Sequence, residues 1–423
     1  MKKVFLSAVL ISLAGAPLPC FGSGYEFEGI GTREVSRAGA AVADSDDWSA
    51  VYWNPANIVR ATAKSGTEIG LEAIYGIARE KDSNSLSSSL AGPIFQKDQL
   101  DSRSVLGALG VISPLGDKAA VGFGVYTPLL QGVDFHDKSD SMGTVLDYKG
   151  SAMVLTSNIS LSAQITPSFS AGAGLNLLYG RIHSETNLTA LVVPNPFLIP
   201  PTLTANVNGK LDGSGLGTEG VFGLTWDPHP ALSLAATYRT GSDIPVKGDA
   251  SADSSSILGS QHESSRFKFS LRQPPTLDTG LACRPGNRWT LSFDVHQTYW
   301  HRFSNETTYD TPGALLTDRP NTFTWRDTWK LRFGASWQAA QNTTLLAGYS
   351  YDRFALDSGS VDFANVVDPS MHRFSAGVAQ RWGKRFETIL GAIGGFGNRS
   401  ENGLRYGLSG FQLMAESRLT FGG

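Results

Sequence analysis

The sequence has very little cysteine and no strong excess of charge of either sign. Only 2 of its 423 residues are cysteine, so a dense disulfide framework cannot stabilise the chain. The formal net charge is −3 at pH 7, which is not the basic excess that binds nucleic acid. We therefore expect neither a disulfide-rich domain nor a nucleic-acid-binding protein.

Long hydrophobic runs are also missing, apart from one at the N-terminus. Two lysines precede the apolar run Val4 to Ala16, which is shorter than the ~20 residues that a membrane-spanning helix needs. A basic start, a short apolar run and small residues after it are typical of a secretory signal peptide. We predict that residues 1–22 are this signal, with cleavage after Ser23 as the alternative. The mature chain then keeps Cys283 alone.

The sequence does contain alternating apolar and polar residues with a period of two. Between residues 324 and 337, one face carries Trp325, Trp329, Leu331, Phe333, Ala335 and Trp337. Such segments of ~10 residues, with aromatic residues near both ends, are typical of transmembrane β-barrels, whose apolar face points outward into lipid. A soluble β-sandwich is the alternative, but it does not explain why the aromatic residues keep to the strand ends.

Short turns alternate along the chain with longer polar segments. We interpret these segments as loops at residues 78–102, 127–150, 184–216, 241–264, 304–322, 353–370 and 397–404. One strand on each side of every loop gives an all-β fold, a 14-stranded antiparallel transmembrane β-barrel. A barrel of this size leaves a lumen that side chains alone do not fill. We predict that residues 23–62 plug it and that residues 63–423 form the barrel.

The segment Arg37 to Ile58 resembles a known plug. It combines an Ala- and Gly-rich stretch, several aspartates and Asn54-Pro55-Ala56, and in this it is similar to the N-terminal hatch of the FadL-type outer-membrane transporters. This family carries long-chain fatty acids and related hydrophobic compounds. The likeness continues at residues 125–128, 238–240, 289–303 and 325–328.

The resemblance implies a small helical hatch inside the barrel and capture of a hydrophobic molecule outside it. The cargo then leaves sideways into the membrane, through a gap at the third strand. Fatty acids are the expected cargo, and aromatic hydrocarbons are the alternative. The resemblance also implies a monomer in the bacterial outer membrane, in contact with its lipids, lipopolysaccharide and the barrel assembly machinery. We expect no cofactor and no metal.

The most apolar stretch of the mature chain lies inside the predicted loop 184–216. Its apolar side chains are the candidate capture groove: Leu191, Val192, Val193, Phe197, Leu198 and Ile199. Four prolines between residues 194 and 201 argue against another strand here. A loop that only caps the barrel mouth is the alternative.

The third predicted strand contains residues that weaken or bend a β-ladder. Gly122, Gly124 and Pro128 are therefore the candidates for the lateral gap.

Three basic residues share the predicted lumenal face of one strand. Arg326, Lys330 and Arg332 are candidate contacts for a carboxylate head group. Pairing with lumenal acids is the alternative role for them.

One strand face also carries groups that occur in hydrolases. Ser292, Asp294 and His296 alternate along it, but residues two apart on a strand are ~7 Å apart, which makes a Ser–His hydrogen bond awkward. A polar row that faces the lumen explains the same residues. Because no nucleophile elbow, zinc-binding motif or phosphate loop occurs, we predict that the protein is not an enzyme. A lipid hydrolase and an adhesin barrel are the alternatives from other classes.

Overall fold

The computed structural model describes residues 28–82, 99–139, 145–194, 202–256, 259–303, 306–318, 324–358, 368–401 and 404–422. Nearly all its helical turns lie before the first strand: α2 (Thr32–Val35), α3 (Ala50–Trp53), η2 (Pro55–Asn57) and α4 (Ile58–Ser65). A further single turn, η3 (Trp300–Arg302), lies between two strands. None of the helices in the described ranges is long and apolar enough to cross a membrane.

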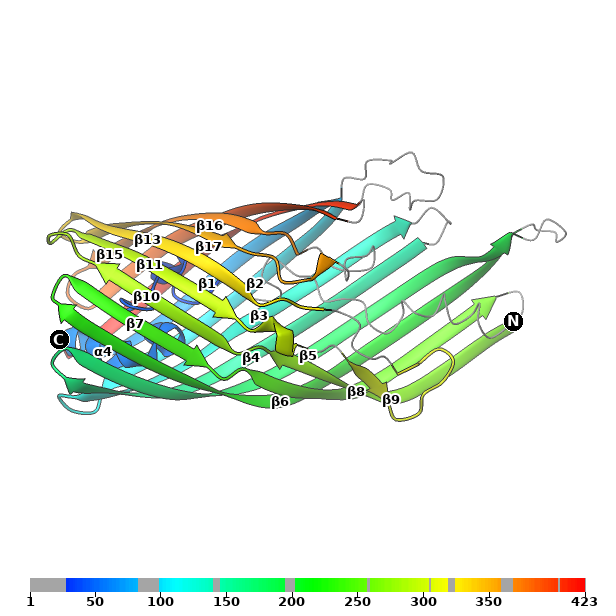
Figure 1. Ribbon diagram of the computed structural model, residues 1–423, viewed down its shortest axis with the longest axis horizontal. Coiled ribbons are helices and arrows are strands. Elements are labelled where there is room, and N and C mark those ends of the chain that lie inside the picture. The colour runs from blue at the N-terminus through cyan, green and yellow to red at the C-terminus, as the bar shows by residue number, and fades with distance from the viewer. Residues whose placement is uncertain are drawn as a thin grey trace.

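All the strands belong to one sheet. They are β1 (Thr67–Asp82), β2 (Gln99–Pro114), β3 (Ala119–Ser139), β4 (Val145–Thr166), β5 (Phe169–Pro194), β6 (Thr202–His229), β7 (Leu232–Arg239), β8 (Ser242–Ser256), β9 (Gly259–Gln273), β10 (Thr276–Cys283), β11 (Trp289–Thr298), β12 (Thr307–Tyr309), β13 (Thr328–Ala340), β14 (Thr343–Asp352), β15 (Met371–Trp382), β16 (Phe386–Glu401) and β17 (Leu404–Phe421). Neighbours pair antiparallel, and β1 pairs with both β2 and β17, so the sheet closes on itself (Figure 1).

The 17 labelled strands make a 14-stranded barrel. β8 continues β7 after a break at Thr240 and Gly241, and β10 continues β9 after Pro274 and Pro275. The short β12 follows β11 in the chain and continues the same barrel strand. Counting each of these three continuations with the strand before it reduces 17 labelled strands to 14, so the predicted fold class is confirmed.

The outer face of the barrel is apolar, as the alternation predicts. Trp289 and Trp337 face each other across β11 and β13, with stacked rings whose centroids are 5.6 Å apart. Large side chains exposed on the barrel surface include Phe222, Trp226, Phe333, Trp382 and Leu413. A continuous apolar surface of this kind suits contact with lipid.

Several predicted loops are wrong, because the strands continue past the apolar band. The predicted loop 184–216 belongs mostly to β5, which ends at Pro194, and to β6, which begins at Thr202. The predicted loops 127–150, 241–264 and 397–404 are also largely strand. Ser-, Gly- and Asp-rich composition suggested turns, but these segments satisfy their backbone groups by pairing with each other in antiparallel ladders.

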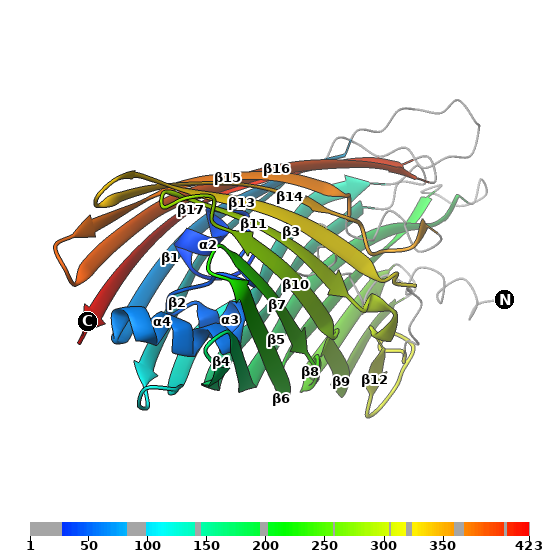
Figure 2. The ribbon, with the colours of Figure 1, turned by 60° about the vertical axis from the view of Figure 1, so that its left-hand side comes forward.

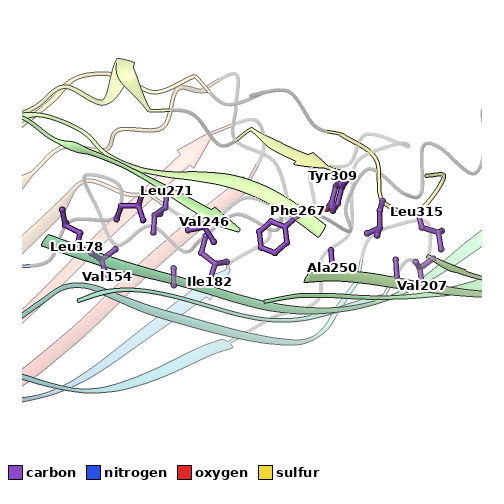
Figure 3. Close-up of a cluster of buried hydrophobic side chains, with 14 residues drawn as sticks. Val154, Leu178, Ile182, Val207, Val246, Ala250, Phe267, Leu271, Tyr309 and Leu315 are labelled. Carbon is purple, nitrogen blue, oxygen red and sulfur yellow. The ribbon is translucent and has the colours of Figure 1, made fainter. Parts of the chain in front are cut away.

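The two ends of the barrel are filled differently. At one end, which we call the hatch end, the short turns and the C-terminus lie near the helices of the N-terminal segment (Figure 2). At the other end, the long-strand end, β4, β5 and β6 pack their inner faces against β8 and β9. This packing buries an apolar cluster of Ala152, Val154, Leu178, Ile182, Val207, Ile244, Val246, Ala250, Ala252, Phe267, Leu271, Tyr309, Leu315 and Leu316 (Figure 3).

Candidate functional site

The N-terminal segment Glu28–Ser65 lies inside the barrel, and we call it the hatch (Figure 2). Its last helix, α4, ends at Ser65, past the predicted boundary at residue 62. Gly66 then adopts a φ of 70°, a conformation that favours glycine, and β1 begins at Thr67. The chain thus turns directly from the hatch into the wall.

Glycines of the wall make room for the hatch. A Cβ at any of the following positions would come within 3.1 Å of a hatch atom: Gly70, Gly110, Gly122, Gly124, Gly172, Gly223, Gly280, Gly334, Gly348, Gly377 and Gly391. The Trp48 indole, for example, lies between Gly70 and Gly110, where a Cβ from either strand would overlap the ring. The small lumenal residues therefore leave space that the hatch occupies.

Carboxylates of the wall accept hydrogen bonds from the hatch. The bonds are Gly31 N to Glu72 (3.0 Å), Thr32 N to Glu416 (2.6 Å), Trp48 Nε1 to Glu416 (2.8 Å), Trp48 N to Glu68 (2.9 Å), and Ala41 N and Val42 N to Asp294 (2.7 and 2.9 Å). Charge-assisted bonds of this kind are about twice as strong as neutral ones. They fix the hatch at several points around the barrel.

Ion pairs add to these bonds. Arg418 of β17 lies 2.8 Å from Asp47 of the hatch, and Arg33 of the hatch lies 2.8 Å from Glu387 of β16. All four side chains are largely buried. Removing one partner of a buried ion pair is costly, because the other charge stays buried without compensation.

Glu34 is a hatch carboxyl whose pKa is raised. Burial raises its pKa to about 8, against the opposing effect of Arg37, whose guanidinium lies 3.0 Å away. Arg37 also pairs with Asp44 at 2.6 Å, and Glu34 Oε1 has no hydrogen-bond partner in the described chain. A protonated Glu34 fits these surroundings at neutral pH.

Asn54, Pro55 and Ala56 form a joint between the hatch and the wall. Asn54 Oδ1 accepts from Ala56 N at 3.0 Å and begins the turn η2, in which Pro55 comes first. Its Nδ2 donates to Val42 O within the hatch at 2.9 Å and to Thr225 Oγ1 of β6 at 2.9 Å. The motif therefore has a structural role that its sequence pattern alone did not reveal.

A cavity lies on the inner side of the hatch, toward the long-strand end. Its aromatic walls include Tyr52 and Trp53 of the hatch, Tyr126 of β3 and Trp300 of η3. Leu271 belongs both to this cavity and to the apolar cluster. The cavity therefore adjoins the apolar interior of the long-strand end.

The same cavity has charged groups. Arg332 Nη1 donates to Asp278 at 3.1 Å, and the His296 ring lies 2.6 Å from the same carboxylate. Arg239 lies 3.8 Å from Glu219 and 4.5 Å above the centre of the Tyr52 ring. Aromatic and ionic surfaces thus meet in one chamber.

Two hydroxyl groups in the cavity have no protein partner in the described chain. Thr156 and Thr276 are both buried and line the cavity, and neither Oγ1 atom makes a hydrogen bond. Buried hydroxyls normally have a partner. These two are available to a polar group of a bound molecule.

The three predicted head-group residues do not lie together. Arg332 lines the cavity, whereas Lys330 is completely buried and lies 3.2 Å from Asp352. Arg326 is half exposed and pairs with Asp357, so the prediction that it shares their lumenal face is wrong. β13 begins only at Thr328, and the strand alternation does not extend back to Arg326.

The third strand is irregular, but not at its glycines. Gly122 and Gly124 sit in regular register with both β2 and β4, and each lies against Val51 of the hatch. The β3–β4 register shifts between Tyr126 and Leu129, at a bulge that contains Pro128.

Pairing between β2 and β3 also ends at this level. Its last pair is Leu109 with Val125. Beyond it, the described part of β3 pairs only with β4, and the rest of β2 only with β1. Pro128 lines the cavity. The cavity thus reaches the place where the wall loses its ladder.

The predicted capture residues fall on a strand end. Leu191, Val192 and Val193 belong to β5, which corrects their placement in a loop. Proline is tolerated here because Pro194 is the terminal residue of the strand. Phe197, Leu198 and Ile199 lie outside the described residues.

The residues of the possible hydrolytic triad serve separate partners. Ser292 donates to Asp44 at 3.1 Å, Asp294 accepts from the hatch, and His296 pairs with Asp278. Among the described residues, no group of three or more His, Cys, Asp or Glu side chains could hold a metal ion. This arrangement supports a polar lumenal row.

Several cavity residues were not singled out from the sequence. Tyr52 and Trp53 directly precede the Asn54 motif, and Arg239 lies inside one of the stretches that resemble the family. Their positions were visible, but their role was not. Glu219 and Asp278 have no comparable local pattern, since the fold alone brings them to the chamber.

Comparison with known proteins agrees with this architecture. A Pseudomonas aeruginosa FadL homologue superposes with a TM-score of 0.77 at 16% identity, over 95% of this chain and 100% of that one. The Pseudomonas putida toluene transporter TodX superposes with a TM-score of 0.72 at 19% identity, over 94% and 99%. A 47 kDa outer membrane protein of Pasteurella multocida is 23% identical over 395 residues, or 90% of this chain and 88% of that protein.

The family assignment comes from the sequence of the hatch and most of the barrel. Residues 21–386 match the family described as outer membrane protein transport protein (OMPP1/FadL/TodX). A 14-stranded barrel with an apolar outer face suits the bacterial outer membrane, where this family resides. The chain therefore belongs to the OMPP1/FadL/TodX family of outer membrane proteins.

Proposed function

We propose that this protein takes up hydrophobic molecules with a polar head group, most specifically long-chain fatty acids, across the outer membrane. The observation that carries this proposal is the cavity where Trp53, Tyr126 and Trp300 face Arg332 and Arg239. A fatty acid loses ~0.8 kcal/mol per CH₂ on returning to water, so it requires an apolar route with a few polar groups for its head. The chamber and the apolar cluster supply both.

Arg332 is the proposed contact for the carboxylate. It lines the cavity and donates a hydrogen bond to Asp278, a carboxylate that also pairs with His296. Thr156 and Thr276 offer hydroxyl groups on the same chamber. Lys330 is a weaker candidate, because it is buried beside Asp352.

The proposed exit is sideways into the membrane beside β3. The β2–β3 ladder stops at Leu109 and Val125, and Pro128 connects this level to the cavity. A molecule that leaves here enters lipid without crossing water. Backbone N–H groups of the hatch donate to Asp294 and Glu416, and these hydrogen bonds fix the hatch in place. The hatch blocks the straight route to the periplasm.

The end of β5 remains the proposed place of first capture. Leu191, Val192 and Val193 lie at the long-strand end, which faces outside the cell if the short turns are periplasmic. Phe197, Leu198 and Ile199 follow in the sequence as candidates. Further proposals are a monomeric protein without cofactor or catalysis, inserted by the barrel assembly machinery among outer-membrane lipids and lipopolysaccharide.

A direct test compares two labelled cargoes in cells that lack other uptake proteins of this class. We expect a labelled fatty acid to enter and toluene to compete weakly. Arg332→Met keeps an unbranched apolar stem and removes the charge, and it should reduce fatty acid uptake about tenfold, the loss of one charge-assisted bond. Lys330→Met, on the same strand, tests the weaker candidate and should reduce uptake less than Arg332→Met.

Aromatic hydrocarbons are the second candidate cargo, and the four aromatic cavity walls favour them. Strong competition by toluene, together with unchanged uptake in Arg332→Met, would support this alternative.

Deletion of Arg37 to Ile58 separates transport from adhesion. Unchanged, saturable uptake without this segment would contradict a hatch-guided route.

A further inference from the structure

A short segment closes the apolar cluster at the long-strand end. We call residues Thr307–Asp318 the strap. It begins as β12, which pairs with β9, and it then turns back over the cluster. Leu315 and Leu316 are only 1% and 4% exposed, and they lie among apolar side chains that include Val207 and Ala250 (Figure 3).

One carboxylate fixes the turn of the strap. Glu263 of β9 accepts hydrogen bonds from three consecutive backbone N–H groups, those of Ala314, Leu315 and Leu316, each at 2.9 Å. Gly313 permits this approach, because a Cβ there would lie 2.5 Å from Glu263 Cδ. The carboxylate therefore acts as a latch that places the two leucines in the cluster.

The strap has a shorter β-ladder than the strands beneath it. Its ladder with β9 contains three residue pairs, whereas β6 and β8 share ten and β8 and β9 share fifteen. Each ladder pair must be broken for a strand to separate. If any part of this end opens, the strap opens before the strands beneath it.

The cluster under the strap leads toward the cavity. Leu315, Phe267 and Leu271 belong to the same cluster, and Leu271 also lines the cavity. An apolar chain placed under the strap would therefore contact a continuous apolar path to the chamber. The two leucines now fill the outer end of that path.

We propose that the strap is an autoinhibitory lid, in which Leu315 and Leu316 occupy the site of an incoming apolar chain until that chain displaces them. The inference rests on the proposed function, since it assumes cargo that enters from this end. Exchange of one apolar occupant for another changes little buried area, so the opposition comes from polar contacts between the strap and β9. These are the Glu263 latch, the short β12 ladder, the ion pair of Asp310 with Lys268 and the hydrogen bond from Thr311 N to Ser265 Oγ. Closure then prevents exposure of the path to water when cargo is absent.

A reversible covalent latch tests the lid. In a Cys283→Ser background, Glu263→Cys with Gly313→Cys places two thiols where the carboxylate now meets the turn. The reduced protein lacks the latch, and the oxidised protein is locked. We measure labelled fatty acid uptake and photocrosslinking of a diazirine-bearing fatty acid to peptides of the cluster.

We expect both readouts to fall at least tenfold on oxidation and to recover on reduction. Asn187→Cys with Asn208→Cys bridges β5 and β6, which are directly opposed in register, and serves as the control that should show no change. Equal crosslinking in the oxidised and reduced latch variant would overturn the proposal.

Removal of the occupant gives an independent test. Leu315→Ala with Leu316→Ala should increase crosslinking within the cluster several-fold, provided that the purified barrel keeps its folded gel mobility. Unchanged or reduced crosslinking by the folded variant would count against the lid. If crosslinking follows the latch but even the parent chain takes up no fatty acid, the proposed function fails and the lid stands. If the parent takes up fatty acid normally and the disulfide changes neither uptake nor crosslinking, the lid fails and the proposed function stands.

Discussion

The two ends of the barrel are closed by different kinds of interaction. At the hatch end, backbone N–H groups donate directional hydrogen bonds to Glu72, Asp294 and Glu416, which hold the hatch backbone in one place. At the long-strand end, side chains such as Phe267 and Leu315 fill the interior by apolar packing. Apolar packing is non-directional, so an apolar molecule can replace it, whereas a fixed set of hydrogen bonds cannot be replaced by a hydrocarbon.

This difference assigns separate roles to the ends. In the proposed function, the hatch is a fixed plug against water and solutes, and the long-strand end is the entrance for molecules that resemble its own interior. A single kind of closure would not serve both purposes. Changes that act on one end and spare the other test this division.

The largest expected effect comes from truncating the apolar end. Phe267→Ala removes a fully buried ring and should destabilise the barrel by about 3–5 kcal/mol, because a cavity remains among Val246, Ala250 and Tyr309. Urea unfolding in lipid vesicles measures the loss. Phe374→Ala, on the exposed outer face, is the control, and its cost should be clearly smaller.

Hydrogen exchange compares how strongly backbone amides are protected at the two ends. In Phe267→Ala, backbone amides of β8 and β9 should lose protection, while those of the hatch keep theirs. Equal loss at both ends would mean that the two closures form one cooperative unit.

Removal of a clamp should have the next largest effect, at the opposite end. Asp294→Ala leaves the N–H groups of Ala41 and Val42 buried without an acceptor, which costs about 2–4 kcal/mol. We expect hatch amides to exchange faster and β8 amides to remain protected. Asp294→Asn retains an acceptor oxygen and should lose less than half as much.

A bulky wall residue should displace the hatch without removing any bond donor. In Gly223→Val, the new side chain would overlap Asn54 and Pro55, at a cost of about 1–3 kcal/mol from overpacking. Ion conductance in planar bilayers should rise above that of the parent. Gly394→Val is the control, since its Cβ would meet its nearest atom at 3.7 Å. A closed Gly223→Val barrel would show that the hatch fits more loosely than its contacts indicate.

The smallest expected effect is a pH dependence confined to the hatch. Burial raises the pKa of Glu34 to about 8 from an ordinary value of 4.5, so the folded hatch binds a proton that the unfolded chain releases. The contribution of Glu34 is fully present below pH 4.5 and is lost as the pH rises through about 8. Protection of hatch amides should therefore fall between pH 4.5 and about 8.

Glu34→Gln is the matched variant for this pH dependence. It mimics the protonated side chain, so protection of the hatch amides should depend less on pH in this variant. Protection of the β8 and β9 amides should not depend on pH in either protein. The same slope in the variant and the parent would assign the dependence to another group.

Much of the barrel could be predicted from the chain because strand alternation is a local property. Trp289, Phe333 and Trp337 face outward as their two-residue period requires. The strand ends were missed because the polar residues of β8 and β9 have the composition of loops, and only their pairing in register shows that they are strands. The error at Arg326 has the same origin, since alternation does not mark where a strand begins.

The site was predictable only in part. The strand alternation predicts that Arg332 faces the lumen, and Arg332 lines the cavity. Its partner Asp278 is 54 positions away in the sequence, and no local pattern connects them. Gly122 and Gly124 were interpreted as weak points of β3, whereas both give room to Val51 of the hatch.

The sequence by itself determined the number of strands, the outward face of each and the presence of an N-terminal segment with Asn54, Pro55 and Ala56. These features depend on neighbours in the chain. Only the tertiary structure decided what the wall glycines face, which carboxylates clamp the hatch and how the strap closes the apolar path. Those features depend on contacts such as Thr32 with Glu416, 384 positions apart, which exist only once the barrel has closed around its own N-terminal segment.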